Sequence, residues 1–532
     1  MVHAVRLQPG VHELALHVLG ELTERLATPE GDAFGFDQLA QLGDQLTQEA
    51  TSVDVGDMPA NFCGQILWLS AMLSDEDVEG IGFLDRRDGL ALVVLDKLEL
   101  EDGGLVELAD KRGDGFFPCQ PRSARAPLAH DYLEGGGSEW PDDDGLDNAV
   151  FCDARGEFFE RILAEGTNRL ADCVIPSFTN PNNMSIVTGT PPNVHGIAAN
   201  FFHDRDSGED VMTNTPKFLW VDTIFKAVFD AGGKVAVVTA KDKLTPLLRH
   251  GLDFSTGRAI CFSSEKSDQA TKADNGIERA NRYVGLPVPE VYSADLSEFI
   301  FAAGVKLIEE ERADLMYLST TDYVQHKNAP GSGGANDFYA MMDGYFHKLD
   351  ALGAVLVLTA DHGMNAKHND AGDPDAIYLQ DFIDEWDLGG QNGDGTARVV
   401  LTITDPYVVH HGALGSFCTI YLSDGADADN IAGRLRDLDG ILTVYGNAEG
   451  CKEFELPPER MGDLIVISEK HKVLGSSVEH HDLSGLDVPL RSHGGVTEQR
   501  VPLILNRPTP DLPAARRLRN FDAFDVALNY AR

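Results

Sequence analysis

Apolar residues in the second part of the chain are grouped in short runs separated by longer amphipathic stretches. The runs are residues 148–152, 234–239, 315–319 and 354–359, and two of the amphipathic stretches are residues 221–231 and 299–310. Apolar strands that alternate with helices are typical of a mostly parallel sheet covered by helices on both faces. We therefore predict an α/β fold, doubly wound around a mostly parallel central sheet, for residues 148–532.

The rest of the chain has a different pattern. Apolar and alternating runs within residues 82–106 predict strands, and residues 1–111 are expected to form a small N-terminal α+β module of unknown role. Residues 112–147 are rich in Gly, Pro and Asp, which predicts a linker or loop. Later strand-like runs predict a cap subdomain inserted at approximately 366–488, before the chain returns at His493. Those runs are residues 397–403, 419–422 and 463–467.

The charge balance is strongly acidic, with 86 acidic and 43 basic side chains and a net charge of −43. This sign argues against a nucleic-acid partner and against an anionic membrane surface. Because the acidic residues are spread along the chain, we expect a halophilic protein, in which salt screens the self-repulsion. The same field repels an anionic substrate, so local cations are needed to bind one.

The cysteines and the hydropathy of the chain indicate in which cellular compartment to expect the protein. The seven cysteines include no C-x-x-C pair, which argues against a disulfide framework or a cysteine-type zinc site. We find no apolar run of about 18 residues and no signal-peptide pattern, so we expect a cytoplasmic protein. The sequence does not decide the oligomeric state and leaves a homodimer open.

Ionisable residues follow the predicted strands closely. Asp153, Lys241 and Asp361 come almost directly after three of the apolar runs, and Asp322 lies four residues after Leu318. In parallel sheets, ligands bind at the carboxyl ends of the strands. The sequence therefore predicts a polar site at this edge of the sheet.

Three short motifs in this region carry side chains that bind metals. Asp361-His362 places a carboxylate beside an imidazole, and Asp322-x-x-x-His326 places the same pair on one face if a helix follows Asp322. His493 precedes two glycines, which allow close backbone approach. Each motif also has a plain structural interpretation: a strand-to-loop turn, a helix cap with an exposed histidine, and an ordinary turn.

Thr179 is a candidate nucleophile. It follows a loop and precedes a helical segment, and a helix N-terminus favours the negative charge of a phosphoryl group. The alternative is that Thr179 only caps the helix, which Ser and Thr commonly do.

Taken together, these residues resemble the alkaline phosphatase superfamily and, within it, the phosphonoacetate hydrolases. The resemblance covers most of residues 150–532 and does not extend over residues 1–147. The stretches that carry it are residues 172–183, 240–244, 317–326, 359–367, 404–416 and 489–496.

The resemblance implies two zinc ions per subunit and a set of site residues. One zinc would be held by Asp153, Thr179, Asp361 and His362, and the other by Asp322, His326 and His493. The substrate would contact Asn200, Lys241, Lys243 and His326. At Asp153 the sequence departs from the family pattern, because Ala154 follows where the family has glycine and the segment before Thr179 is shorter.

The implied reaction is hydrolysis of phosphonoacetate to acetate and phosphate, with Thr179 as nucleophile and a phosphothreonine intermediate. Lys241 and Lys243 also fit a small anionic phosphonate from the residues alone, because they alternate in a segment expected to be extended and would share one face. Ordinary surface lysines are the alternative. Two other functions stay open: a phosphodiesterase or nucleotide pyrophosphatase of the same superfamily, and a catalytically impaired phosphonate-binding protein.

Overall fold

The computed structural model describes residues 92–95, 156–386, 397–403, 414–484 and 486–532. All of them belong to one compact unit of the chain, Arg87–Arg532. Among these residues, no helix is long and apolar enough to cross a membrane.

A seven-stranded sheet forms the centre of this unit. Its strands are β1 (Leu92–Leu95), β2 (Thr167–Asp172), β5 (Val235–Thr239), β6 (Ala259–Ser263), β7 (Leu315–Ser319), β8 (Val355–Thr359) and β17 (Arg500–Leu505). They lie in the order β2-β17-β8-β1-β7-β5-β6. Neighbours from β8 to β6 are parallel, and β17 runs antiparallel to both of its neighbours. The predicted mostly parallel sheet is confirmed.

Strand β1 comes from the region in which we expected a separate module, residues 1–111. It lies instead between β7 and β8, with Leu92 paired to Leu315 on one side and to Val355 on the other. An apolar run can satisfy its backbone hydrogen bonds in any parallel sheet, and local periodicity does not say which sheet it joins. The predicted module boundary is therefore wrong for β1. The strand expected at residues 148–152 lies outside the described residues.

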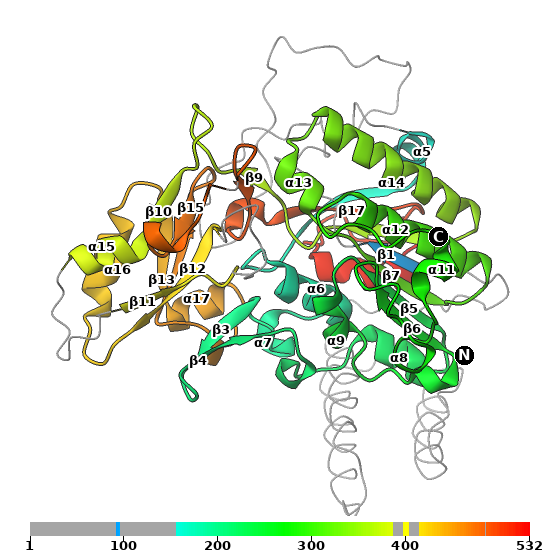
Figure 1. Cartoon of the computed structure of the whole chain (residues 1–532), viewed down its shortest axis with the longest axis horizontal. Helices are drawn as coiled ribbons and strands as arrows, with labels where there is room; N and C mark the ends of the chain where they lie inside the picture. The colour runs from blue at the N-terminus through cyan, green and yellow to red at the C-terminus, as the bar shows by residue number, and fades with distance from the viewer. Residues whose placement is uncertain (1–91, 96–155, 387–396, 404–413, 485) are drawn as a thin grey trace, which may run out of the picture. The chain divides into compact units, whose positions relative to one another are not determined.

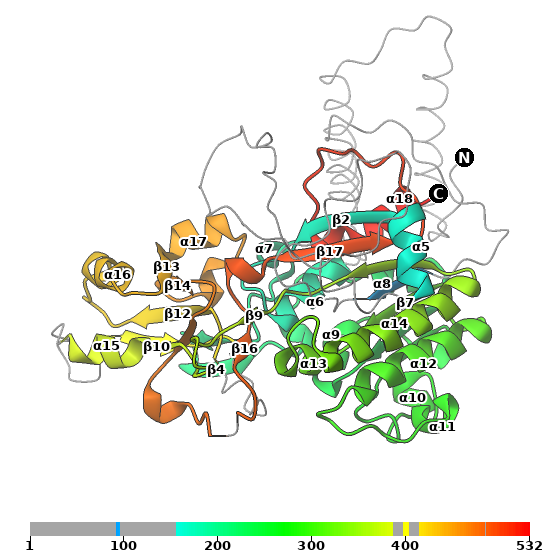
Figure 2. The ribbon, with the colours of Figure 1, turned by 90° about the horizontal axis from the view of Figure 1, so that it is seen from above.

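Helices cover both faces of the central sheet (Figures 1 and 2). On β5, Ala236 and Val238 belong to the core that includes α5, α12 and α14, whereas Val235 and Val237 belong to the core that includes α6, α8, α9 and α18. This alternation follows from the two-residue period of a strand. The helices are α5 (Glu157–Glu165), α6 (Thr179–Thr188), α7 (Pro192–His195), α8 (Ile224–Asp230), α9 (Thr245–Leu248), α10 (Lys272–Asn275), α11 (Ala280–Val284), α12 (Asp295–Glu309), α13 (Tyr323–Lys327), α14 (Gly333–Ala351) and α18 (Ala523–Asn529).

A second, antiparallel sheet lies in the segment where the cap was expected, with the order β11-β12-β14-β13. Its own apolar core is built mainly from the inward faces of these strands and from α15 and α16. The elements are β10 (Ala376–Tyr378), α15 (Leu379–Glu385), β11 (Ala397–Val400), β12 (Phe417–Leu422), α16 (Ala428–Arg436), β13 (Ile441–Gly446), α17 (Asn447–Glu453), β14 (Leu464–Ser468) and β15 (Val473–Gly475).

Two short antiparallel pairs complete the fold. Strand β9 (Asn365–Ala366) carries the chain toward the cap and pairs with β16 (Arg491–Ser492), which brings it back. A hairpin of β3 (Phe201–Asp204) and β4 (Glu209–Met212) follows α7. The cap is therefore an insertion whose two ends are hydrogen-bonded neighbours.

Candidate active site

The carboxyl ends of β7 and β8 lie at one edge of the central sheet. Strand β1 fixes their register, because Leu95 pairs with both Leu318 and Leu358. Asp322 follows Leu318 by four residues and Asp361 follows Leu358 by three. Parallel strands in this register bring both aspartates to the same edge, as the sequence predicted.

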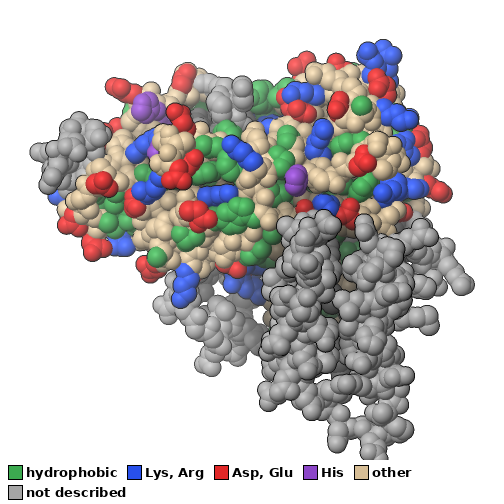
Figure 3. All heavy atoms as spheres, turned by 90° about the horizontal axis from the view of Figure 1, so that it is seen from below, with side chains coloured by type: hydrophobic (Ala, Val, Ile, Leu, Met, Phe, Trp, Pro, Cys, Tyr) green, Lys and Arg blue, Asp and Glu red, His purple; other side chains and the backbone are tan. Residues whose placement is uncertain are grey.

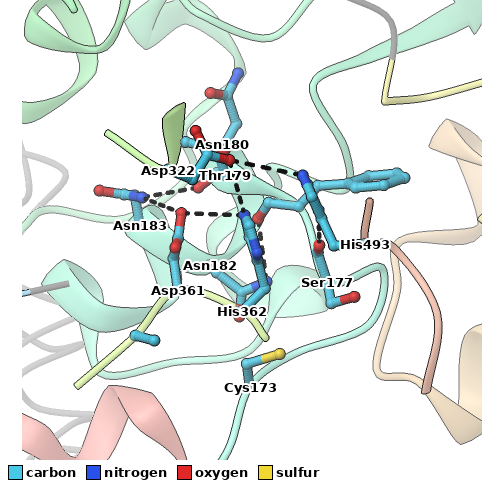
Figure 4. A network of polar contacts seen from close by, with 12 residues as sticks. Cys173, Ser177, Thr179, Asn180, Asn182, Asn183, Asp322, Asp361, His362 and His493 are labelled. Atoms are coloured by element: carbon cyan, nitrogen blue, oxygen red, sulfur yellow. Dashed lines mark hydrogen bonds and ion pairs between the residues drawn. The ribbon is translucent and has the colours of Figure 1, made fainter. Parts of the chain in front are cut away.

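Five side chains from three separate segments converge there. Figure 4 labels four of them: Asp322, Asp361, His362 and His493. Oδ2 of Asp322 lies 3.3 Å from Nε2 of His326, 3.8 Å from Nε2 of His493 and 4.0 Å from Nε2 of His362. His362 Nε2 is in turn 3.6 Å from Oδ2 of Asp361. The rings of His362 and His493 are stacked, with centroids 3.7 Å apart and planes 9° apart.

Hydrogen bonds fix the tautomer of all three histidines. Nδ1 of His326 donates to the carbonyl of Arg491 (2.8 Å), and Nδ1 of His493 donates to that of Ser177 (2.7 Å). Nδ1 of His362 donates to the carbonyl of Gly363 (3.0 Å). A carbonyl can only accept, so in each neutral ring the proton is on Nδ1 and the lone pair is on Nε2.

This donor set fits zinc. Three imidazole nitrogens and two carboxylates face one another, and the ligand atoms of Asp322, His326 and His493 all lie within 4.8 Å of one another. Ligand atoms of a tetrahedral zinc are about 3.3 Å apart, since each bond is about 2.0 Å. The backbone carbonyls on Nδ1 are the outer partners that orient metal-binding histidines.

Burial also keeps His493 neutral. The pKa of His493 is well below its ordinary value, chiefly because the ring is buried and next because positive charge on His362 or His326 would repel it. Asp322 acts in the opposite direction. The edge of Phe178 packs against the ring of His493 at 5.8 Å. A neutral, packed imidazole is the form that binds a metal.

Thr179 is the first residue of α6, and Phe178, in an extended conformation, is the capping residue. Thr179 is therefore not the N-cap that the alternative interpretation required. The loop before it is held by Asn182, whose side chain donates to the carbonyl of Val174 (3.1 Å) and accepts from its N–H (2.7 Å). The side chain of Asn520 donates to Asn182 (3.0 Å).

Asn183 links the start of α6 to the aspartate of β8. Its Nδ2 donates to the carbonyl of Thr179 (3.0 Å) and to Oδ2 of Asp361 (3.2 Å). Its Oδ1 accepts from the hydroxyls of Tyr317 (2.9 Å) and Ser319 (3.3 Å) on β7. Asn183 thus fixes Asp361 relative to the residue expected to act as nucleophile. Asn183 ends the stretch 172–183 that carries the family resemblance, but the sequence alone predicted no role for it.

The predicted substrate residue Asn200 lies next to the same helix. Its Oδ1 accepts from the backbone N–H of Asn180 at 3.0 Å, and the residue is buried. Because Oδ1 is committed to α6, the amide nitrogen of Asn200 is the group available for a ligand oxygen.

Lys241 and Lys243 lie at the carboxyl end of β5, beside the end of β7, since Thr239 pairs with Ser319. Lys241 is extended, but residues Asp242–Leu244 form a 3-10 turn, η5. We had predicted that the two lysines alternate along an extended segment, and this prediction is wrong because the turn interrupts that segment. Asp242 is the one turn-favouring residue in Ala240–Leu244, and by itself it does not predict a 3-10 turn.

Asp153, the remaining predicted ligand, lies outside the described residues. A buried ion pair, Lys367 with Glu498, lies beside the ligand loops and was missed. One feature of the sequence could have indicated it. Lys367 follows four uncharged residues directly after Asp361-His362, in a chain that has few basic residues.

Comparison with known proteins adds the family. The model for type I phosphodiesterase / nucleotide pyrophosphatase matches residues 144–495. This chain belongs to that family. The family lies within the alkaline phosphatase superfamily, so the resemblance noted in the sequence and the predicted fold class are both confirmed.

Two crystal structures of a phosphonoacetate hydrolase from Sinorhizobium meliloti 1021 are similar to this chain. In the complex with phosphonoformate, the hydrolase is 60% identical to this chain, and the match covers 71% of this chain and 90% of the hydrolase with a TM-score of 0.68. The complex with phosphonoacetate is 59% identical, with the same coverage and a TM-score of 0.67. A curated phosphonoacetate hydrolase from Penicillium oxalicum is 57% identical over 42 residues, which are 7% of this chain and 58% of that protein.

Proposed function

We propose that this chain hydrolyses phosphonoacetate to acetate and phosphate. The observation that carries the proposal is the convergence of three histidine Nε2 atoms and two aspartates at the edge of the sheet, next to the start of α6. A phosphonoacetate hydrolase that is 60% identical over most of its length supports the substrate.

We assign the metal ligands in two groups. Asp322, His326 and His493 would hold one zinc ion. Asp361 and His362, with Asp153 and the hydroxyl of Thr179, would hold the other. Bound zinc supplies positive charge to the phosphoryl oxygens and lowers the pKa of a coordinated hydroxyl or water.

Thr179 is the nucleophile in this proposal. The hydroxyl proton of Thr179 passes to bulk water, and Oγ then attacks phosphorus in line with the carbon–phosphorus bond. The oxygen–phosphorus bond forms as the carbon–phosphorus bond breaks, and the product is a phosphothreonine. The N-terminus of α6, at which Thr179 lies, favours the negative charge of the phosphoryl group.

The leaving group is the harder problem, because the bonding pair passes to carbon and into the adjoining carboxylate. Lys241 and Lys243 would bind that carboxylate and stabilise the developing charge, and Asn200 would donate to the phosphoryl group. Nδ1 of His326 donates to Arg491 and its Nε2 is assigned to zinc, so His326 would contact the substrate through the carbon edge of its ring. Uptake of a proton from water gives acetate. A water molecule then attacks the phosphothreonine, releases phosphate and returns the proton to Thr179.

The direct test is phosphate release from phosphonoacetate by the purified full-length chain in high KCl, with and without added zinc. We expect zinc-dependent release that falls by about 10³-fold or more in Thr179→Ala, because the covalent step is lost. Thr179→Ser is the matched control and keeps a hydroxyl. Equal rates for wild type and Thr179→Ala would overturn the assignment of the nucleophile.

Phosphodiester hydrolysis is the second candidate, and the family match favours it. The same preparations distinguish the two reactions when bis-p-nitrophenyl phosphate replaces phosphonoacetate. The lysine pair predicts preference for the substrate with a carboxylate. That preference should be lost in Lys241→Met/Lys243→Met, whereas a phosphodiesterase would be little affected.

A further inference from the structure

Lys367 and Glu498 form an ion pair that water does not reach. Their Nζ and Oε1 atoms are 2.8 Å apart, and both side chains are 0% exposed. Such pairs contribute little to stability, since desolvation of the two charges offsets their attraction. A fully buried pair beside a candidate metal site therefore calls for another explanation. We propose that Lys367 and Glu498 position the histidines of the two metal sites and couple them to the cap.

The carboxylate of Glu498 organises the loop that follows His493. Its Oε2 accepts from the backbone N–H of Gly495 at 2.9 Å. Its Oε1 accepts from the side chains of Thr497 at 2.6 Å and Asn365 at 2.7 Å. Burial raises the pKa of Glu498, but Lys367 and the side chains of Thr497 and Asn365 outweigh burial and keep the pKa below its ordinary value. The carboxylate is thus a charged anchor for this loop.

The same residue holds the loop that carries His362. The backbone carbonyl of Glu498 accepts from the N–H of Gly363 at 2.7 Å, and the carbonyl of Gly363 orients His362. A Cβ on Gly363 would lie 3.1 Å from the oxygen of Glu498, so the two backbones are in close contact. Glu498 therefore contacts the loops of His362 and His493, one from each proposed zinc site.

Lys367 extends the connection to the cap. Besides Glu498, its Nζ donates to the carbonyl of Lys470 (2.5 Å), which lies between β14 and β15. The backbone N–H of Lys367 donates to the carbonyl of Leu490, directly next to β16. The pair thus lies where the chain enters and leaves the cap, and it joins a cap turn to both ligand loops.

The proposal rests on the proposed zinc site, so the test measures zinc affinity by competition with a chromophoric chelator and needs no substrate. We expect Glu498→Gln and Lys367→Met each to weaken binding of at least one zinc by about 10- to 100-fold, as outer partners of metal ligands do. Lys472→Met is the matched control. Its pair with Asp375 (3.0 Å) lies within the cap, but the two side chains are 23% and 30% exposed.

The double variant Lys367→Met/Glu498→Leu separates positioning from stability. It removes both charges of the pair and leaves neither one buried without its partner, so its unfolding free energy should recover relative to the single variants. Its zinc affinity should stay low if the pair positions the ligands. Folded single variants with wild-type zinc affinity would overturn the inference, and so would a double variant that recovers both properties. A wild-type chain that binds no zinc would instead overturn the proposed function.

If the variants do not fold, hydrogen exchange of the wild-type chain asks the same question. Zinc should slow the amides of Gly363 and Gly495, and the slowing should extend to the cap turn around Lys470. Protection that stops at the ligand loops would contradict the coupling to the cap.

Discussion

The side chain of Asn183 donates both to Asp361 and to the backbone carbonyl of Thr179. We expect Asn183→Asp to reduce zinc affinity and the hydrolysis rate by about 10- to 100-fold, because a second carboxylate would stand 3.2 Å from Asp361. Chelator competition and initial rates would measure both effects. Tyr317→Phe is the milder comparison, since it removes one donor to Asn183 and leaves the contact with Asp361. A larger effect from Tyr317→Phe than from Asn183→Asp would contradict this account.

His195 makes stability depend on pH. Its Nδ1 accepts from the N–H of Ile197 (3.1 Å), so its Nε2 donates to the hydroxyl of Ser185 (2.9 Å) on α6. Burial, with a smaller contribution from Arg460, lowers the pKa of His195 from 6.5 to about 3. Between these two values the unfolded chain binds more protons than the folded one. Stability from this group is therefore complete above pH 6.5 and is lost as the pH falls toward 3.

The expected size is a loss of about 1.4 kcal/mol per pH unit within that window. Urea unfolding of wild type and His195→Gln between pH 6.5 and 4.5 should show their difference in unfolding free energy shrinking at about this rate. His250 is exposed, and His250→Gln should track the wild type. A constant difference for His195→Gln would mean that the buried ring does not control this part of the pH dependence.

At the scale of elements, the sequence predicted those whose pattern is local. The strands expected at residues 234–239, 315–319 and 354–359 are present as β5, β7 and β8, and the helix expected after Asp322 is α13. The i, i+4 spacing of Asp322 and His326 therefore places both on one turn, as a helix requires. Two-residue and 3.6-residue periods survive in any context, which explains why these elements could be found.

The remaining contacts depend on partners far away in the sequence. Asn183 contacts Asp361 over 178 positions, and Lys367 contacts Glu498 over 131. No local pattern distinguishes an asparagine that orients a ligand from one that caps a turn. The same limit explains why β1 was assigned to a different module, because an apolar run does not indicate which strands it will pair with.

Strand β1 also defines a test of the first ligand. Asp153 was expected at the end of a strand, but the strand between β7 and β8 is Leu92–Leu95, and Asp96 follows it in the sequence. If Asp153 is the ligand, Asp153→Asn should lower zinc binding to fewer than two ions per chain while Asp96→Asn keeps two. Metal analysis of both purified variants would decide. The reverse result would transfer the role to Asp96.

At the scale of the whole molecule, the excess of acidic side chains is expected to make stability depend on salt. The face seen in Figure 3 carries acidic side chains scattered among basic and polar ones, and the whole chain has a net charge of −43. Repulsion of this size weakens as salt shortens the Debye length from about 10 Å at 0.1 M to about 3 Å at 1 M. We expect the midpoint of thermal unfolding to rise steadily as the KCl concentration increases from about 0.1 to 1 M, because the added salt screens the repulsion between acidic side chains.

A series in sorbitol at equal osmolality separates screening from general solvent exclusion. KCl should stabilise the chain more than sorbitol does. A midpoint that is highest in dilute buffer would contradict a halophilic protein.

The short β9–β16 pair has a consequence for how the cap can change during evolution. Ala366 and Arg491 are direct partners, so everything between them begins and ends at adjacent backbone positions. A tight hairpin turn can join two such positions without disturbing the strands beneath. Lineages could therefore lengthen or trim this segment by a single genetic exchange, and the site below would be inherited intact as long as the turn around Lys470 still reaches Lys367.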